Sequence, residues 1–239
     1  MTAVIVARPE PDNERLCAAL AQRGYVPVPV PLIRIASKSL DPVERRLVQD
    51  LDLFDVVICT SGHAATRVVE EIDRVWPQLP AAPAWLAVGM RTAGILADFG
   101  IDAAIPARET SEGLLDHALL ARAFEKRCLI VRGEGGRGRL QRTLLSRGAR
   151  VDALELYVRE PVRPTDAMRR SAAGAGLAVA TSGELVQLLG AVIPPGARSA
   201  MRLIVPSERV AELARGEGYL AEVADGASDE ATLDALDAL

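Results

Sequence analysis

Two copies of a Thr-Ser-Gly sequence, Thr60–Gly62 and Thr181–Gly183, each follow a short apolar run. Hydroxyl groups and free backbone N–H groups at the carboxyl end of a parallel strand, just before a helix, form an anion site. One copy alone is explained more simply by N-capping of the next helix. Two matching copies favour a large ligand with several anionic groups, and the candidate ligand-binding residues are Thr60, Ser61, Gly62, Thr181 and Ser182.

A glycine-rich segment, Val131–Gly138, reads VRGEGGRG. Its glycines let the backbone approach a ligand closely, and its two arginines can hold a carboxylate or phosphate through paired hydrogen bonds. The order of the glycines does not match a dinucleotide-binding fingerprint, and the Lys-Ser/Thr ending of a P-loop is missing. The segment therefore predicts an anion site rather than a nucleotide site, with Arg132, Gly133, Gly136 and Arg137 as its candidates.

Other candidates have simpler explanations beside the functional one. Arg8 ends the first predicted strand, and Gly89 and Thr92 lie between a strand and a helix, where ordinary turn chemistry also explains them. Tyr157 lies in an extended run. The sequence supports two interpretations of it about equally: a functional residue, or an ordinary residue of an amphipathic edge strand. His63 and His117 lie on helical segments and are interpreted as surface or capping residues.

The sequence lacks the usual sets of catalytic side chains. No Gly-x-Ser-x-Gly sequence, Cys/His couple or paired-carboxylate motif is present, and 2 histidines exclude a His-rich metal site. The 3 cysteines, Cys17, Cys59 and Cys128, are far apart in apolar runs and are typical of buried thiols in a reducing compartment. An enzyme of this composition has to work mainly by positioning a reactive substrate.

Length and charge limit the partners. The 239 residues fit two domains, and 49% hydrophobic but only 3% aromatic residues suit helices packed on parallel sheets. A formal net charge of −4 argues against binding nucleic acid or an anionic membrane through bulk charge. No apolar run approaches the roughly 20 residues of a membrane span, and the N-terminus enters a strand directly. We therefore expect a soluble, cytoplasmic protein, and a monomer.

Strands and helices alternate along the chain. Short apolar runs predict buried parallel strands at 4–7, 56–59, 86–88, 128–131, 177–180 and 203–205. One helical face, which Pro77 ends, carries Ala65, Val68, Val69, Ile72, Val75 and Trp76, and another helix opens at Ser111. Gly24, Gly100, Gly148 and Gly218 stand where glycines end helices. This alternation predicts doubly wound α/β sheets.

The chain also repeats itself. Arg8 and Gly24 match Arg132 and Gly148 at an offset of 124, the Thr-Ser-Gly sequences match at 121, and Gly100 matches Gly218 at 118. An ordered set of slowly drifting offsets indicates a duplication. Two long extended runs, 25–35 and 150–161, occupy equivalent places in the repeat. Because prolines alternate in the first run, we expect edge or linker strands there, pairing as a connector beside a cleft.

Taken together and in order, these segments resemble the uroporphyrinogen-III synthase family. The resemblance covers nearly the whole chain through VIVARP, a helix ending RGY, FDVVICTSG, AVGMRTA with LADFG, TSEGLL, LIVRGEGGR, SRGARVDALELYVRE and AVATSG. It implies two doubly wound (Rossmann- or flavodoxin-like) domains that arose by duplication. Residues 1–31 with 161–239 form one, residues 37–152 form the other, and linker strands at 32–36 and 153–160 join them.

The resemblance also implies the reaction. The family converts hydroxymethylbilane into uroporphyrinogen III in heme biosynthesis, with loss of water, inversion of ring D and closure of the macrocycle, and it uses no cofactor. Tyr157 matches the family's candidate for assisting hydroxyl departure. The substrate is a tetrapyrrole with several carboxylates, and the residues matching its binding motifs are Arg8, Thr60, Ser61, Gly62, Gly89, Thr92, Ser111, Arg132, Gly133, Gly136, Arg137, Thr181, Ser182 and Ser207.

The sequence departs from the family at two places and leaves two rival interpretations. Ser207–Ala211 replaces a Gly-Pro-Thr-Thr-Ala sequence, so Ser207 is the candidate for a hydroxyl missing near Val210, and His63 replaces an Asn. The first rival is a non-enzymatic, two-lobed anion-binding protein. The second, a nucleotide-dependent transferase, needs a phosphate loop that the sequence lacks.

Overall fold

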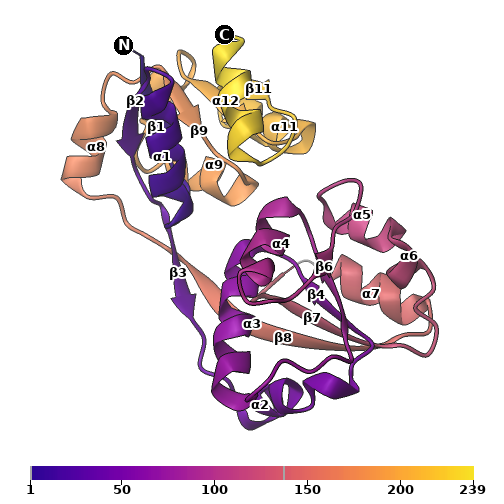
Figure 1. Ribbon diagram of the computed structural model, residues 1–239. Coiled ribbons are helices and arrows are strands. Elements are labelled where there is room, and N and C mark those ends of the chain that lie inside the picture. Colours follow the sequence, from indigo (N-terminus) through magenta and orange to yellow (C-terminus); the bar gives the residue numbers. More distant parts are fainter. Residues whose placement is uncertain (1, 137) are drawn as a thin grey trace. The chain divides into compact units, whose positions relative to one another are not determined.

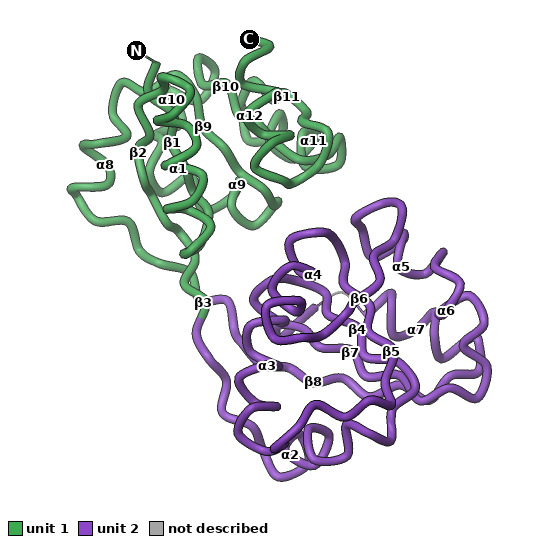
Figure 2. The backbone as a smooth tube through the Cα atoms, in the orientation of Figure 1, with its two compact units in different colours: residues 1–35, 160–239 green, residues 36–159 purple. Residues whose placement is uncertain are grey.

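The computed structural model describes residues 2–136 and 138–239. The chain divides into two compact units, one formed by residues 1–35 with 160–239 and the other by residues 36–159 (Figure 2). The predicted α/β class with parallel sheets is confirmed, because each unit contains its own sheet. The predicted domain limits, which set the linker strands apart from both domains, stay a prediction.

Unit 1 contains a five-stranded sheet in the order β11-β10-β9-β1-β2, with parallel neighbours. Buried leucines of α1 and α12 pack on one face of this sheet, and α9 and α11 pack on the other (Figure 1). The elements are β1 (Ala3–Val6), α1 (Asp12–Gln22), β2 (Val26–Pro29), α8 (Asp166–Ala172), β9 (Leu177–Val179), α9 (Gly183–Leu189), α10 (Pro195–Arg198), β10 (Arg202–Val205), α11 (Glu208–Gly216), β11 (Leu220–Val223) and α12 (Asp229–Asp237).

Unit 2 contains a six-stranded sheet in the order β3-β8-β7-β4-β5-β6. Helices α5, α6 and α7 cover one face, where Val56 and Ile58 of β4 enter their apolar cluster, and α3 packs against α4. The elements are β3 (Ile33–Ser37), α2 (Pro42–Gln49), the 3₁₀-helix η1 (Leu51–Leu53), β4 (Val56–Cys59), α3 (Gly62–Val75), β5 (Ala84–Ala87), α4 (Met90–Ala97), β6 (Ala103–Ala104), α5 (Ser111–Asp116), α6 (Ala118–Ala121), β7 (Arg127–Gly133), α7 (Arg139–Ser146) and β8 (Arg150–Pro161).

Apart from β3 at the edge of the six-stranded sheet, the two sheets share one strand order, 2-1-3-4-5, although they are assembled differently from the chain. In unit 1, strands numbered 1 and 2 in this order are β1 and β2, and strands numbered 3, 4 and 5 are β9, β10 and β11. In unit 2, strands numbered 1 and 2 are β7 and β8, and strands numbered 3, 4 and 5 are β4, β5 and β6. The repeat offsets relate the same segments: β1 to β7, and β4 to β9. Each unit therefore combines the two-strand part of one repeat with the three-strand part of the other.

The first extended run is two strands rather than one. β2 is the edge of the unit 1 sheet, whereas β3 belongs to the other sheet and lies next to β8. Val26 and Val30 donate backbone hydrogen bonds to Thr2 and Val6 of the β1 segment, 2.9 Å each. The alternate positions carry proline, which has no N–H to donate, and an edge strand needs donors on one side only. The prediction of an edge strand and of a β3–β8 neighbour pair is confirmed.

Helix ends follow the sequence signals closely. Gly24, Gly100, Gly148 and Gly218 have φ values of 83°, 76°, 81° and 92°, which L side chains rarely adopt. The predicted helix before Pro77 ends at Val75, but Val75, which was expected on the buried face, is exposed. The short strands β6 and β11 were not predicted from apolar runs.

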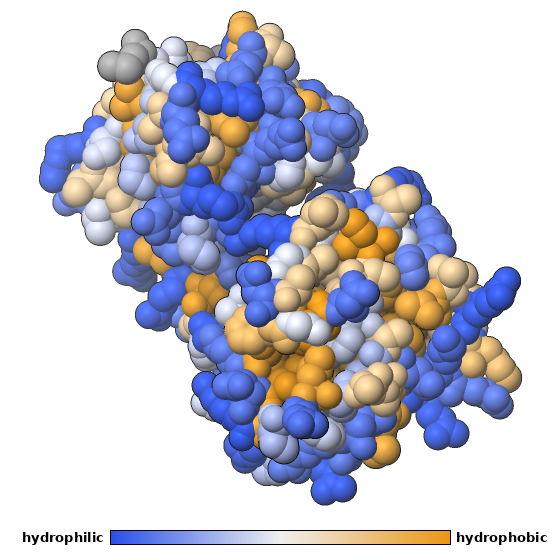
Figure 3. All heavy atoms as spheres, viewed as in Figure 1, coloured by the Kyte–Doolittle hydropathy of each residue, from blue (hydrophilic) through white to orange (hydrophobic). Residues whose placement is uncertain are grey.

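No helix in the described part of the chain is long and apolar enough to cross a membrane. On the face in view in Figure 3, hydrophilic residues are spread over both units, and hydrophobic residues lie among them. Exposed large hydrophobic residues are single and scattered in the sequence, as on most folded domains; examples are Val43, Met90 and Phe124.

Candidate functional site

In unit 2 the carboxyl ends of β4 and β7 lie side by side at the point where the strand order reverses. In doubly wound sheets, ligands bind at this topological switch point. Thr60 follows β4, and both its backbone N–H and its hydroxyl donate to the Val131 carbonyl of β7, 3.1 Å each. The Thr60 hydroxyl is therefore used to join the two strand ends.

Tyr157 reaches this point because β8 contains a β-bulge. The register between β7 and β8 moves from Arg132↔Glu155 to Gly133↔Tyr157, so Leu156 is an additional residue on β8. Bulges turn a side chain toward a new direction and are frequent beside active sites. Here the bulge sets Tyr157 opposite Gly133, and the Glu134 N–H donates to the Tyr157 carbonyl at 2.8 Å.

The Tyr157 ring is buried, with 4% of the residue exposed, and three groups surround it. Its hydroxyl is 3.0 Å from the Ser61 hydroxyl. A Cβ built on Gly133 would stand 2.6 Å from Cζ of the ring, so only glycine permits this approach. The His63 ring meets the phenol edge-on, with 5.7 Å between centroids and 63° between planes. Sequence reasoning assigned His63 to the surface or a cap and missed this contact.

The glycine-rich segment after β7 presents one arginine whose position is described. Arg132 donates to the Glu155 carboxylate at 3.1 Å, and Lys38 lies 4.0 Å from the same carboxylate. Gly136 lies beside the Arg132 side chain, where an added Cβ would stand 3.2 Å from Cδ. Arg137 lies outside the described residues. The roles of Arg132, Gly133, Gly136 and Arg137 in substrate binding stay predictions.

At the end of β5, a carboxylate of the chain itself occupies the start of α4. Gly89 is the N-cap of α4, and the Met90 N–H donates to Glu109 Oε1 at 3.2 Å. A Cβ on Gly89 would stand 2.6 Å from the carboxyl carbon of Glu109. Thr92 is buried in the first turn of α4, whereas Ser111 is exposed at the first position of α5, which Thr110 caps. Sequence reasoning did not identify Glu109.

In unit 1 the corresponding arginine is held within the unit. Arg8 is 3% exposed; it pairs with Asp229 and donates to the Ala227 carbonyl at 2.9 Å and to Thr232 at 3.2 Å. Burial lowers the pKa of Arg8, although the Asp229 charge opposes this shift. Burial acts to raise the pKa of Asp229, but hydrogen bonds and charge from Arg15 and Arg8 outweigh it and lower that pKa. Substrate binding by Arg8 stays a prediction.

The hydroxyl residues of unit 1 repeat part of the unit 2 pattern. Ser182 caps α9 by accepting from the Leu185 N–H at 3.3 Å, as Ser61 caps α3 by accepting from the Ala64 N–H at 3.1 Å. Thr181 is partly buried just after β9. Ser207 occupies the N-cap of α11 but makes no side-chain capping bond within the described residues. Its hydroxyl is therefore not committed to capping.

The cysteines and histidines do not form a metal site among the described residues. Cys59 and Cys128 are fully buried and Cys17 is partly exposed, all three as free thiols. Burial raises the pKa of Cys17 and of Cys128 to about 11, and it raises the pKa of Cys59 further. These thiols are therefore almost entirely protonated at neutral pH. His117 caps α6 by accepting from the Leu119 N–H, as the sequence indicated.

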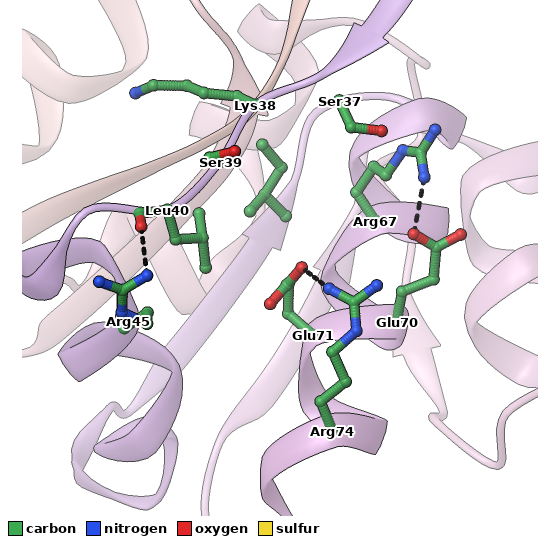
Figure 4. Close-up of a pocket in the computed structure, with 10 residues that line it drawn as sticks. Ser37, Lys38, Ser39, Leu40, Arg45, Arg67, Glu70, Glu71 and Arg74 are labelled. Atoms are coloured by element: carbon green, nitrogen blue, oxygen red, sulfur yellow. Dashed lines mark hydrogen bonds and ion pairs between the residues drawn. The ribbon is translucent and has the colours of Figure 1, made fainter.

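A cavity of about 330 Å³ lies elsewhere in unit 2, between the segment after β3 and one face of α3 (Figure 4). Its charged side chains pair locally: Arg67 donates to Glu70 at 2.7 Å, and Arg74 donates to Glu71. Arg45 donates to the Leu40 carbonyl at 2.7 Å. The lining, as far as the described residues show, includes none of the predicted site residues. Leu156, the bulge residue next to Tyr157, is among the lining residues.

Two comparisons with known sequences agree. The family model described as uroporphyrinogen-III synthase HemD matches residues 14–236. The chain is 37% identical over 244 positions to the uroporphyrinogen-III synthase of Salmonella typhimurium, covering 98% of this chain and 99% of that protein. It is also 37% identical over 246 positions to the Escherichia coli enzyme of the same name, with the same coverage.

Solved structures support the fold at lower identity. Uroporphyrinogen-III synthetase from Helicobacter pylori matches with a TM-score of 0.65 at 16% identity, over 100% of both chains. A mutant uroporphyrinogen III synthase from Thermus thermophilus matches with a TM-score of 0.62 at 19% identity, again over 100% of both chains. The family model and the full-length relatives lead to one conclusion: the chain belongs to the uroporphyrinogen-III synthase family.

Proposed function

We propose that this chain is a uroporphyrinogen-III synthase, a lyase that cyclises hydroxymethylbilane with loss of water and inversion of ring D. The observation that carries the proposal is the 37% identity to two relatives of that name over 98% of the chain. The phenol at the unit 2 switch point supports it, because the reaction needs a weak acid and orientation rather than a strong nucleophile.

Tyr157 is the proposed catalytic residue. When the hydroxymethyl C–O bond breaks, the bonding pair leaves with the oxygen, which takes a proton and departs as water. The Tyr157 hydroxyl can supply that proton and regain one from solvent. The azafulvenium cation left behind then bonds to the α-carbon of ring D that already carries the bridge to ring C. The old bridge bond breaks and re-forms at the other α-carbon of ring D, which loses its proton, so the protein has to hold ring D near the reactive carbon. A positioned proton donor contributes on the order of 10² to 10⁴ in rate.

The substrate carboxylates are proposed to bind at the strand ends of each unit. Backbone N–H groups at the starts of α3 and α4 point toward these ends, and the helix dipole favours negative charge there. Arg132 carries positive charge at the same edge of the unit 2 sheet. In unit 1 the candidates are Thr181, Ser182 and Ser207, with the Ser207 hydroxyl free of capping. We also propose that the protein acts in the cytoplasm as a monomer.

The decisive experiment supplies purified protein with freshly generated hydroxymethylbilane, oxidises the product and separates the uroporphyrin isomers by chromatography. The proposal requires that type III predominates, because only ring inversion gives that isomer. A protein-free control measures spontaneous closure to type I. If the protein yields type I alone, the synthase proposal fails and a non-enzymatic anion-binding protein becomes the better explanation.

A further inference from the structure

We propose that Ser61 is a positioning residue for Tyr157, in addition to being the cap of α3. The proposal rests on the proposed function, since it assigns Ser61 to proton donation by Tyr157 rather than to direct contact with a substrate carboxylate. The Ser61 hydroxyl lies 3.0 Å from the Tyr157 hydroxyl and 3.1 Å from the Ala64 nitrogen, so both contacts use one oxygen.

The capping bond fixes where the Ser61 oxygen lies. Ser61 has extended backbone angles, and its oxygen accepts from the Ala64 N–H, as an N-cap residue does. A serine hydroxyl carries one hydrogen and two lone pairs. With one lone pair used by Ala64, Ser61 can donate its hydrogen to the Tyr157 oxygen. The phenol hydrogen then points away from Ser61 and is available to the leaving hydroxyl.

The same contact stabilises the phenol oxygen after its proton has left. Ser61 then donates to a phenolate, and a hydrogen bond to an ionised oxygen is about twice as strong as a neutral one. The oxygen also lies beside the first turn of α3, where the helix dipole favours negative charge. Ser61 therefore favours the transition state for proton donation over the ground state.

The ring itself is fixed by groups other than Ser61. Gly133 lies against the ring and His63 meets it edge-on, and the bulge at Leu156 sets the backbone. These contacts limit movement of the ring. The Ser61 hydroxyl, 3.0 Å away, is the group that can set the direction of the Tyr157 hydroxyl.

The repeat shows that capping alone does not account for this pair. Ser182 holds the equivalent place in unit 1 and caps α9 in the same way, with 3.3 Å to the Leu185 nitrogen. The strand that corresponds to β8 in unit 1 is β2, which has no tyrosine and is followed by Val30, Pro31, Leu32 and Ile33. A serine cap with a phenol is therefore particular to unit 2.

The kinetic test compares Ser61→Ala, Ser61→Thr, Tyr157→Phe and the double variant Ser61→Ala/Tyr157→Phe. We expect Ser61→Ala to lower kcat about tenfold, as loss of one hydrogen bond in the transition state does, with KM nearly unchanged. Ser61→Thr should restore kcat, because threonine keeps the hydroxyl and the cap. In the Tyr157→Phe background, Ser61→Ala should lower kcat no further.

Thr165→Ala is the matched control, since Thr165 caps α8 at 3.2 Å from the Met168 nitrogen and touches no proposed site residue in the described chain. Its melting temperature should fall by about 2–4 °C, as for loss of a cap in a protein of this size, without loss of kcat. A rise in KM at unchanged kcat, or additive loss in the double variant, would show direct substrate contact by Ser61 and overturn the proposal.

A second readout needs no turnover. The chain has 3 tyrosines, so tyrosine labelled with ¹³C at Cζ alone gives three resonances, and Tyr157→Phe identifies one of them. Ser61→Ala should shift the Tyr157 resonance and leave the other two in place; an unmoved resonance would refute the contact. If Tyr157→Phe keeps the wild-type kcat and the wild-type protein makes the type III isomer, the role of Ser61 is overturned but the proposed synthase function stands. Type I alone from the wild-type protein would overturn both.

Discussion

Tyr157 lies directly across from Gly133, so that a single methyl group on that glycine would stand 2.6 Å from the phenol carbon. The two residues are paired because the bulge adds Leu156 to β8. The glycine is required by this approach and not by its backbone angles, because Gly133 is absent from the positive-φ residues of the described chain. The tyrosine that the family resemblance suggests as catalytic therefore has its phenol ring packed directly against the backbone of a glycine.

Replacing Tyr157 with phenylalanine should slow turnover by on the order of 10², the lower range for loss of a positioned proton donor. Folding should weaken by only about 1 kcal/mol, because one hydrogen bond is lost and Ser61 keeps its bond from Ala64. Isomer-resolved turnover and urea unfolding measure the two effects. Unchanged turnover would remove Tyr157 from the catalytic residues.

Gly133→Ala should displace the phenol and lower kcat to nearly the level of Tyr157→Phe. The added methyl group has no space, so we also expect folding to weaken by about 1–3 kcal/mol. Gly94→Ala is the control, because nothing lies within 4 Å of an added Cβ there and the site is inside α4. That variant should keep its turnover and gain about 0.5–1 kcal/mol of stability. Equal turnover in both variants would contradict the packing argument.

Glu109→Gln should lower KM several-fold at unchanged kcat. The Glu109 carboxylate occupies the start of α4 beside Gly89, where a substrate carboxylate is proposed to bind, so the two negative charges compete. The neutral amide of glutamine repels a substrate carboxylate less than the charged Glu109 carboxylate does. Steady-state kinetics at low and high salt should show the difference shrinking as salt screens the charges. Glu112→Gln, which changes an exposed residue paired with Arg139, serves as the control; an equal change in KM there would indicate a general charge effect.

Asp229→Asn should destabilise unit 1 strongly, by about 3–5 kcal/mol, because it leaves the buried Arg8 without its anionic partner. Asp166→Asn is the control: that carboxylate is 83% exposed and pairs with Arg169 on the surface. Its effect should stay within about 1 kcal/mol. Urea unfolding at pH 7 measures both variants, and similar midpoints would argue against a structural role for the Arg8–Asp229 pair.

The same pair predicts a dependence on pH. The pKa of Asp229 is lower in the folded protein than in the unfolded chain, so the unfolded state takes up the proton first as pH falls. The stabilisation is fully present above the unfolded value of about 3.9 and is lost as pH falls through the folded value. Wild-type stability should therefore drop below about pH 4 more steeply than that of Asp229→Asn. Parallel curves would contradict this assignment.

The sequence by itself determined the class of fold and the repeat, and it supplied most of the candidate residues of the site, whose roles stay predictions. Buried parallel strands appear as unbroken apolar runs, glycines at positive φ end helices, and alternate prolines restrict β2 to an edge, so local rules were sufficient for these features. Ser61 and Ser182 could be identified as caps for the same reason.

Contacts between distant residues were decided only by the tertiary structure. The bulge that sets Tyr157 against Gly133 depends on the register of β8 on β7, which no local pattern encodes. The Arg8–Asp229 pair joins residues 221 positions apart, and Glu109 reaches the start of α4 from a loop 19 residues beyond Met90. Which partner a charged or hydroxyl group finds depends on how strands and helices pack. Sequence could therefore predict candidate groups for binding and catalysis, but not which of these groups contact one another in the folded chain.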